Sequence, residues 1–310
     1  MKTSAWLIGA LLLAGSFFCS SAPAQKQSAH STKIKSYYRE KIAPDIQPKA
    51  LWDGRKLMPF HAANFPKMLP ASAAGFLDEN EYVLGLTVNG ESRAYPTRYA
   101  AFHHIINDSV GRPDQGGKQF VAVTYCVVCN SGVRFDPVVN GRLLKFDFYG
   151  IYNGVVTMYD RNTKSVWLQI GGRAIKGPMC GTELKTGPLL DTTWGRWKTL
   201  HPDTLVMAPE ARYSEYYEPE GEPVPRGFTS FPGSYFPKSI THRDTRLPTF
   251  AMVLTVTVPQ PPADVLTASD TTATRTPALY RAYPLKTLKA SSGSVNDMLG
   301  TTPIAVFFEP

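Results

Sequence analysis

Two cysteines, Cys126 and Cys129, are the residues of this chain best suited to chemistry. They lie in the stretch VAVTYCVVCNSGVRF, residues 121–135, where an apolar run ends and a turn begins. Two thiolates at this spacing can bind one metal ion, exchange with other thiols or close a small disulfide. A disulfide that closes so small a loop restricts the unfolded chain little and therefore stabilises little. The spacing favours chemistry, with a structural disulfide as the alternative.

A metal site needs further ligands, and three side chains are candidates. His103 and His104 precede the strand of Cys126, and one of them could face it. Cys180 lies in the turn sequence Gly-Pro-Met-Cys-Gly. The thiolates of the cysteines, the thioether of the methionine in this turn and an imidazole together suit copper, particularly the cuprous ion, or zinc. The leading hypothesis is therefore a soft-metal site made of Cys126, Cys129, His104 or His103, and Cys180, which would serve metal handling or electron transfer.

A thiol–disulfide oxidoreductase is the second hypothesis, and it uses the same cysteine pair. In thioredoxin-like enzymes the motif begins a helix, whose dipole lowers the pKa of the first thiol. Here Asn130-Ser131-Gly132 and another strand follow, which weakens that hypothesis. A non-catalytic binding module is the third hypothesis, so the sequence leaves enzymatic activity open. The chain has no Gly-rich phosphate loop, no G-x-S-x-G and no H-E-x-x-H, so nothing in it predicts a nucleotide cofactor or those hydrolases.

The elements that must position these residues are mainly β-strands. Residues 83–88 and 92–95 are β-rich runs joined by Asn89-Gly90, a strong hairpin signal. A short helix is expected over 97–106, and a turn is expected at Asn107-Asp108 and Gly111. Residues 120–125 predict a buried strand that leads into Cys126. The predicted order of this unit is β-β-α-β.

The same unit is written a second time near the end of the sequence, within residues 250–310. Both copies contain Leu-x-Val, Arg-Ala-Tyr-Pro, Asn-Asp-x-x-Gly and a closing apolar strand in the same order. Where the first copy has TYCVVC, the second has VFFEP. The frame is therefore expected to form without thiols, which indicates that the cysteines serve a function rather than the fold.

The remaining patterns complete an α+β fold that is dominated by β-structure, with two pseudo-repeated units and additional antiparallel hairpins. Asp191-Thr192-Thr193 predicts the start of a short helix that carries Trp194 and Trp197. The expected divisions are a signal peptide at 1–24, an irregular N-terminal extension at 25–75, a main domain with the CxxC motif at 76–212, a Pro- and Gly-rich loop at 213–248, and a shortened second repeat at 249–310 that packs on the main domain.

Five stretches resemble, in order, the landmarks of a family of exported bacterial and archaeal proteins called domain of unknown function 3179. They are RAYP, HHIIND, VTYCVVCNSGVRFD, MYDRNTKSVWLQIGGRAIKGPMCGTEL and TTWGRWKTLHPDTLVM. The resemblance is strong over residues 77–207 and weaker over the second repeat. It implies a fold grouping and a set of landmarks, but no reaction. The chain departs from the family pattern at Val127-Val128, where Pro-Leu is common, and at Cys180, where a small residue is usual.

The N-terminus predicts export. Lys2, the apolar residues 5–18 and the small residues Ala22-Pro23-Ala24 form a secretory signal with expected cleavage after Ala24. A lipoprotein modified at Cys19 is the alternative, but two phenylalanines precede Cys19 where small residues are needed. The predicted location is periplasmic or secreted. No other stretch is long enough to span a membrane, so the mature chain is not expected to do so.

The charge balance is basic but dispersed. The chain has 33 Lys and Arg against 25 Asp and Glu, a formal net charge of +8. These residues are scattered, without the concentrated basic patch that nucleic-acid binding needs. The expected partner is accordingly an envelope protein or a small ligand, and not a nucleic acid.

Overall fold

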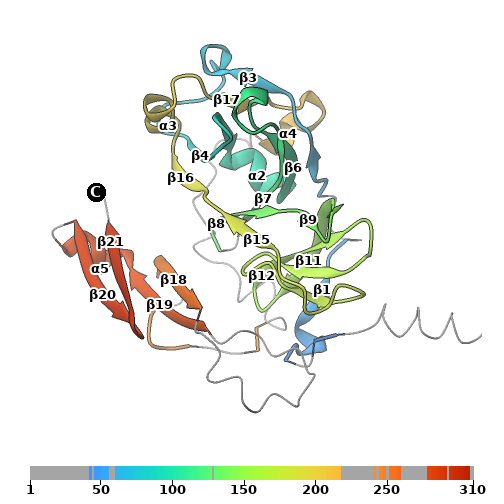
Figure 1. The fold of residues 1–310 in the computed structure, drawn as a ribbon, viewed down its shortest axis with the longest axis vertical. Coiled ribbons are helices and arrows are strands. Elements are labelled where there is room, and N and C mark those ends of the chain that lie inside the picture. Colours follow the sequence, from blue (N-terminus) through green and yellow to red (C-terminus); the bar gives the residue numbers. More distant parts are fainter. Residues whose placement is uncertain are drawn as a thin grey trace, which may run out of the picture. The chain divides into compact units, whose positions relative to one another are not determined.

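The computed structural model describes residues 42–43, 45–55, 60–127, 129–217, 240–241, 244–248, 251–259, 278–291 and 293–307. The predicted signal peptide, its cleavage site and most of the predicted loop at 213–248 lie outside these residues. The described chain consists mainly of strands in several sheets (Figure 1), which confirms the prediction of a β-dominated protein. Within the described residues, no helix combines the length and hydrophobicity that a membrane crossing requires.

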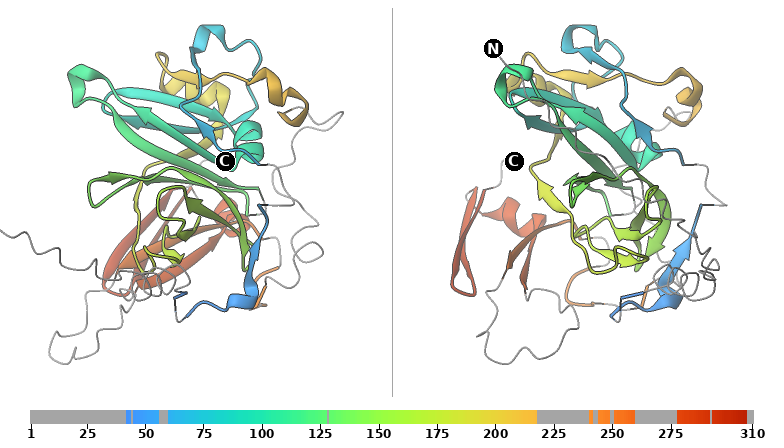
Figure 2. Two further views of the ribbon diagram at one scale, coloured as in Figure 1. Left: turned by 90° about the vertical axis from the view of Figure 1, so that its right-hand side faces the viewer. Right: turned by 45° about the vertical axis from the view of Figure 1, so that its right-hand side comes forward.

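Three five-stranded sheets lie within residues 51–207, one in the middle and two outside it (Figures 1 and 2). The middle sheet contains, in spatial order, β15 (Lys185–Gly187), β8 (Ser131–Asp136), β7 (Gln119–Cys126), β6 (Ile105–Val110) and β2 (Ala63–Asn64). The first outer sheet contains β16 (Leu190–Thr193), β4 (Tyr82–Val88), β5 (Glu91–Pro96), β17 (Leu205–Met207) and β3 (Met68–Pro70). The second outer sheet contains β1 (Leu51–Asp53), β11 (Phe146–Tyr152), β12 (Val155–Asp160), β13 (Val166–Leu168) and β14 (Ala174–Lys176).

Three separate two-stranded hairpins complete the described strands. They are β9 (Val138–Val139) with β10 (Arg142–Leu143), β18 (Val253–Pro259) with β19 (Ala278–Pro284), and β20 (Ser294–Leu299) with β21 (Thr302–Phe307). The α-helices are short: α2 (Thr97–His103), α3 (Trp194–Leu200), α4 (Ser214–Tyr217) and α5 (Leu285–Ala290). Single 3₁₀ turns occur at Pro48–Ala50, Ala71–Ala73, Pro113–Gln115 and Ala211–Tyr213.

The middle sheet is buried on both faces, which explains the nearly continuous apolar run of β7. Successive side chains of a strand point to opposite faces. Val121 and Val123 accordingly pack into a core with residues of the first outer sheet and α2, whereas Ala122 packs with residues of the second outer sheet. Cys126 shares the parity of Ala122, and it packs against Phe148 of β11. The alternation of β7 therefore directs Cys126 toward the second outer sheet.

Asparagine–glycine pairs close the hairpins as the sequence predicts. Asn89 and Gly90, with φ of 44° and 70°, join β4 to β5. Asn140 and Gly141, with φ of 51° and 73°, join β9 to β10. Both residues of each pair have the positive φ of the tight two-residue turns that fit the twist of the flanking strands. The predicted start of α3 is also confirmed, because the Thr193 hydroxyl accepts a hydrogen bond from the Arg196 backbone N–H at 3.4 Å.

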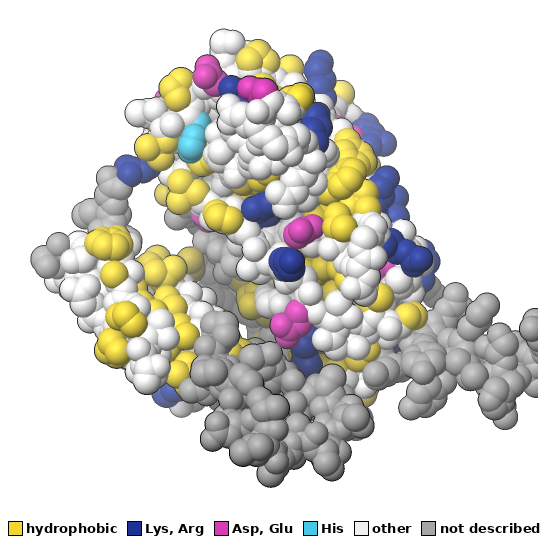
Figure 3. Space-filling view, in the orientation of Figure 1, with side chains coloured by type: hydrophobic (Ala, Val, Ile, Leu, Met, Phe, Trp, Pro, Cys, Tyr) yellow, Lys and Arg dark blue, Asp and Glu magenta, His cyan; other side chains and the backbone are white. Residues whose placement is uncertain are grey.

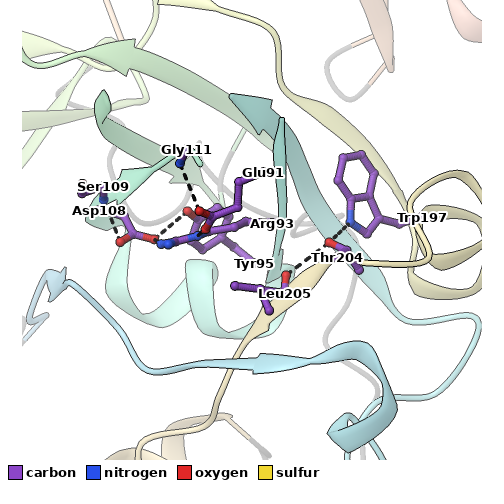
Figure 4. Close-up of polar contacts among 9 residues, drawn as sticks. All are labelled: Glu91, Arg93, Tyr95, Asp108, Ser109, Gly111, Trp197, Thr204 and Leu205. Atoms are coloured by element: carbon purple, nitrogen blue, oxygen red, sulfur yellow. Dashed lines mark hydrogen bonds and ion pairs between the residues drawn. The ribbon is translucent and has the colours of Figure 1, made fainter. Parts of the chain in front are cut away.

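The predicted turn at Asn107-Asp108 is wrong, because both residues lie inside strand β6. Asn107 exchanges two hydrogen bonds with the backbone of Phe146, at 2.9 and 3.0 Å, and so joins β6 to β11. Asp108 accepts hydrogen bonds from Arg93 at 2.5 Å and from the Tyr95 hydroxyl at 2.8 Å (Figure 4). Asn and Asp favour turns when they bond the neighbouring backbone. Asp108 keeps one such bond, from the Ser109 backbone N–H at 2.8 Å, but its other bonds and those of Asn107 go to residues distant in sequence.

The segment expected to be irregular, residues 25–75, contributes short strands in its described part. β1 pairs with β11, β2 pairs in parallel with β6, and β3 pairs with β17. These strands cover sheet edges that would otherwise expose unpaired backbone groups. Their two- or three-residue length leaves no periodicity for a sequence pattern to reveal.

Charged side chains are dispersed over the visible surface. On the face shown in Figure 3, Lys and Arg occur at several separate places, and Asp and Glu lie between some of them. Several cations are held in ion pairs, such as Arg173 with Asp45 at 2.6 Å and Lys198 with Glu79 at 2.5 Å. These positive charges thus each have a carboxylate at short range.

Candidate functional site

The two thiols of the CxxC motif lie close together. The Sγ atoms of Cys126 and Cys129 are 2.8 Å apart, and the Cys129 backbone N–H donates to Cys126 Sγ at 3.3 Å. Cys126 is fully buried and Cys129 is partly exposed. The sulfurs pack against Phe60, Phe148 and Val156. The pair therefore occupies an apolar corner where only Cys129 reaches solvent.

The corner is built by the turn between β7 and β8. Cys126 pairs with Ser131 across this hairpin. Asn130 has a φ of 49°, which lets the chain reverse, and its side-chain oxygen accepts a hydrogen bond from the Tyr125 hydroxyl at 2.5 Å. Asparagine tolerates this left-handed conformation better than most residues. The NSG sequence thus brings the second cysteine back over the first.

Two donors of Cys129 point at the sulfur of Cys126. The hydrogen bond to Cys126 is the largest cause of a pKa of the Cys129 thiol well above its ordinary value, and burial adds to it. Cys129 therefore keeps its proton near neutral pH. If the pair loses a proton, the negative charge is best placed on Cys126 Sγ. This sulfur accepts hydrogen bonds from both the thiol and the backbone N–H of Cys129.

His104 lies in the same apolar environment as the thiols. Its ring contacts Phe60, with 4.3 Å between ring centroids, and stacks on Phe148 at 5.2 Å. Burial lowers its pKa to about 4, so the imidazole is neutral at pH 7. Nδ1 lies 3.1 Å from the backbone oxygen of Tyr125, which requires the proton on Nδ1 and leaves the lone pair on Nε2. Two aromatic rings thus join His104 to the cysteine corner.

His103 is held in a different cluster. Its Nδ1 lies 2.5 Å from the backbone oxygen of His61, and its Nε2 lies 2.6 Å from the hydroxyl of Tyr217. Both ring nitrogens are therefore engaged in hydrogen bonds. Burial lowers the pKa of His103, as it does for His104. The ring packs beside Tyr213 and Tyr217, which places it in an aromatic core next to α4.

Cys180 also belongs to a separate cluster. It follows β14 in a turn where its backbone N–H donates to the oxygen of Gly177 at 3.0 Å. Its side chain packs against a core that includes Ala43, Ile46 and Ile175. The core around Cys126 has no residue in common with this one. The structure thus groups Cys126, Cys129 and His104, while His103 and Cys180 lie in other environments.

The sulfur separation bears on which chemistry fits. A disulfide bond is about 2.05 Å long, whereas two thiolates on one tetrahedral metal with 2.3 Å bonds lie about 3.8 Å apart. The observed 2.8 Å lies between these values and nearer to the bond. Among the residues that the structure describes, no group of three His, Cys, Asp or Glu is arranged to hold a metal ion.

Several residues near the thiols carry no motif that identifies them. Gln169 is fully buried, and its amide donates to Thr124 Oγ1 at 3.3 Å and to the Ser131 backbone oxygen at 3.2 Å. Its Oε1, Ser131 Oγ and Thr157 Oγ1 have no hydrogen-bond partner in the described part of the chain. Such buried oxygens are usual positions for ordered water. The QIGG turn in the sequence gives a signal only for the turn itself.

Fold and site together define a β-dominated protein with a partly buried dithiol corner. Residues 60–310 match the profile of the family described as "protein of unknown function (DUF3179)". The chain belongs to this family, as its sequence landmarks predict. Comparison with curated proteins and with solved structures gave no match.

Proposed function

We propose that Cys126 and Cys129 form a reversible dithiol–disulfide site in an exported protein. The observation that carries the proposal is the 2.8 Å separation of the two sulfurs, which a movement of less than an ångström converts to a bond of about 2.05 Å. The pattern of donors to Cys126 Sγ also supports it, because a stabilised thiolate is what exchange chemistry requires. Export, expected from the N-terminal signal, would expose the pair to an oxidising compartment.

The proposed reaction is a two-electron exchange with a small disulfide. The Cys126 thiolate attacks one sulfur of the disulfide, and the other sulfur leaves as a thiolate that takes up a proton. Cys129 then loses its proton and attacks Cys126 Sγ, which expels the second sulfur of the substrate. The Cys126–Cys129 bond has formed, the substrate disulfide has become two thiols, and both protons are accounted for.

Burial limits the rate of this exchange. Cys126 is the better thiolate but has no exposed surface, while the exposed Cys129 holds its proton. A bulky protein disulfide therefore reaches the nucleophile poorly, and a small disulfide reaches it better. Cys129 keeps its proton, so the reduced pair gains no stability from a second thiolate. The disulfide form is therefore favoured over the reduced dithiol.

The test is redox titration of the full-length mature protein in glutathione buffers, with alkylation and mass spectrometry to count thiols. The expected result is simultaneous loss of two alkylation sites, Cys126 and Cys129, with one midpoint. Cys180→Ser is the matched control, because it removes a thiol from another cluster and should leave the midpoint unchanged. Independent alkylation of the two sites at every potential would contradict the proposal. A pair that stays oxidised even under strong reductant would equally contradict a reversible role.

A soft-metal site remains the second proposal, and the tautomer of His104 favours it. A histidine that ligates a metal usually donates its other N–H to a carbonyl or carboxylate, as Nδ1 does here toward Tyr125. Copper or zinc would then require the two sulfurs to move about 1 Å further apart. Titration with Cu(I) or Zn²⁺ tests this. One equivalent should bind to the wild type and to Cys180→Ser, and binding should weaken in Cys126→Ser and His104→Asn.

We also propose that residues 82–126 and 253–307 are copies of one unit, in which only the first copy carries thiols. The order β4-β5-α2-β6-β7 recurs as β18-β19-α5-β20-β21. A shared bonding pattern supports the duplication. Arg281 and Tyr283 donate to Asp297 at 2.7 and 3.0 Å, which matches the bonds of the RAYP residues to Asp108 in the first copy. A duplicated frame with one sulfur-bearing corner agrees with a functional role for the pair.

A further inference from the structure

A cavity of about 180 Å³ lies beside the thiol corner and takes no part in the chemistry proposed above. Its walls combine two guanidinium groups, one carboxylate, one imidazole and three aromatic rings, which belong to Arg55, Arg161, Asp147, His61, Phe60, Phe148 and Tyr159. The space equals that of about six water molecules in the liquid. It therefore suits a small molecule.

Arg55 is fixed at one side of this cavity. Its Nε and Nη2 donate to the two carboxylate oxygens of Asp53 at 2.9 and 2.5 Å. Its guanidinium carbon also lies 4.8 Å from the ring centroid of Tyr149 and 5.3 Å from that of Tyr159. A guanidinium held by a carboxylate and two rings loses little further entropy when a ligand binds.

Arg161 is fixed in the same manner on the neighbouring strand. Its Nε and Nη2 donate to the two oxygens of Asp147, and the Nη2 bond measures 2.9 Å. For both arginines, the Nη1 group has no hydrogen-bond acceptor within the described parts of the chain. Two amino groups with fixed positions and available protons therefore border one cavity.

The charge and shape of the walls define the class of ligand. Two guanidinium groups and one carboxylate line the cavity, and each guanidinium is paired with a carboxylate, Arg55 with Asp53 and Arg161 with Asp147. The preference for an anion therefore rests on the N–H donors that these pairs leave over, because such donors bond best to a charged acceptor. Guanidinium edges match the planar oxygens of a carboxylate. Phe60, which is partly exposed, gives the cavity an apolar wall that an inorganic anion would leave uncovered, and the nearly buried ring of Phe148 lies behind it with 5.0 Å between the ring centroids.

We propose that this cavity binds a small organic carboxylate with a flat, unsaturated body. The carboxylate accepts hydrogen bonds from the Nη1 groups of Arg55 and Arg161, and the flat body lies against the ring of Phe60. Phe60 and Phe148 also pack on the cysteines, so the ligand would lie one layer of side chains away from the thiols. The binding proposal does not depend on the thiols being redox-active.

Benzoate, benzamide and inorganic phosphate are the probes that test this proposal on the full-length protein. Ligand-observed NMR detects binding of each aromatic probe, and calorimetry gives the dissociation constants. Benzoate should bind, while benzamide, which has the same shape without the charge, should bind at least about tenfold more weakly. Phosphate should fail to displace benzoate at equal concentration. Absence of benzoate binding, or displacement by phosphate, overturns the proposal.

Substitution of the arginines locates the site. Arg55→Gln and Arg161→Gln should each weaken benzoate binding about tenfold or more, because each removes a charged donor. Arg173→Gln is the matched control. Arg173 forms the same two-bond pair with Asp45, at 2.9 and 2.6 Å, but does not line the cavity. A thermal midpoint measured for each variant separates unfolding from loss of binding. Equal weakening in all three folded variants would place the binding elsewhere and overturn the assignment.

Discussion

His104 Nδ1 lies 3.1 Å from the backbone oxygen of Tyr125, the residue that precedes Cys126 in β7. The same histidine ends α2 in the left-handed conformation, with a φ of 56°. One residue therefore ends the helix through its backbone, while its side chain bonds the strand of the thiols and packs on the aromatic wall next to them. Because it does so as a neutral ring in an apolar core, the stability of the corner depends on pH.

The first prediction is that acid destabilises the protein through His104. Burial lowers its folded-state pKa from 6.5 to about 4, so between these values the unfolded chain binds a proton that the folded chain does not. The stabilising contribution is fully present above pH 6.5 and is lost as the pH falls toward 4. Its size is on the order of 3 kcal/mol. Denaturant unfolding measured at steps from pH 7.5 to 4 should show this slope.

Two substitutions isolate the histidine that is responsible. His104→Asn suits the positive φ and should flatten the pH dependence, although lost packing lowers stability at pH 7. His103, whose pKa burial also lowers, leaves part of the slope in place. His103→Asn is the comparison, because it should leave in place the part of the slope that comes from His104. An unchanged slope in His104→Asn would show that other groups cause the acid sensitivity.

The second prediction compares two aspartates that make the same bonds in different surroundings. Asp108 is buried and bonds Arg93, whose side chain is 7 % exposed (Figure 4). Burial lowers the pKa of that arginine, but attraction and hydrogen bonding to Asp108 outweigh it, so the pKa is raised above the ordinary value and the arginine stays charged. Asp108→Asn removes one of the two carboxylates that compensate this charge, the other being Glu91 at 2.6 Å, and should cost about 2 kcal/mol or more.

Asp297 bonds Arg281 in the second unit, but the Arg281 side chain is 43 % exposed. Water can solvate this cation when its partner is lost, so Asp297→Asn should have a much smaller effect than Asp108→Asn. Urea unfolding of both variants measures the difference. Equal losses would mean that the buried network contributes no more than a surface ion pair.

Short-range signals made the local structure predictable from the sequence. Asn89-Gly90 specifies its hairpin through two positive φ angles, and Thr193 specifies the start of α3 through one hydrogen bond. The strand at Asn107 and Asp108 was not predictable in this way. Their partners, among them Phe146 and Arg93, are distant in sequence, and only the assembled sheets bring them together.

The candidate site likewise has one part that the sequence predicts and another part that it does not. The spacing of Cys126 and Cys129 reveals the close pair, because a tight turn follows within three residues. The wall of Phe60 and Phe148 leaves no pattern in the sequence, since it forms only where β11 and the segment before β2 meet the corner. Tertiary packing also determines which of the two adjacent histidines lies near the thiols. It is His104, the residue at which α2 ends.

The third prediction concerns unequal effects of the two cysteines on stability. Cys126→Ser puts a hydroxyl among apolar side chains and should cost about 1–3 kcal/mol. Cys129→Ser should cost less, because Cys129 is partly exposed and a serine there can bond water. Both measurements must be made under reducing conditions, so that no disulfide contributes. A larger loss in Cys129→Ser than in Cys126→Ser would contradict the observed burial.

The last prediction tests how closely α3 approaches the first outer sheet. A Cβ atom placed on Gly85 of β4 would lie 2.4 Å from ring carbons of Trp197. That ring cannot move easily, because it is buried and its Nε1 donates to Thr204 at 2.8 Å. Gly85→Ala should therefore destabilise the protein by about 2 kcal/mol or more.

Gly75→Ala provides the matched control, since no heavy atom lies within 4 Å of its Cβ position. It should change stability by no more than about 0.5 kcal/mol, or slightly raise it by restricting the unfolded chain. Thermal unfolding followed by tryptophan fluorescence would report on both variants and on the environment of Trp197. Equal unfolding of the two alanine variants would contradict this prediction. It would mean that the spacing between β4 and α3 does not require a glycine at position 85.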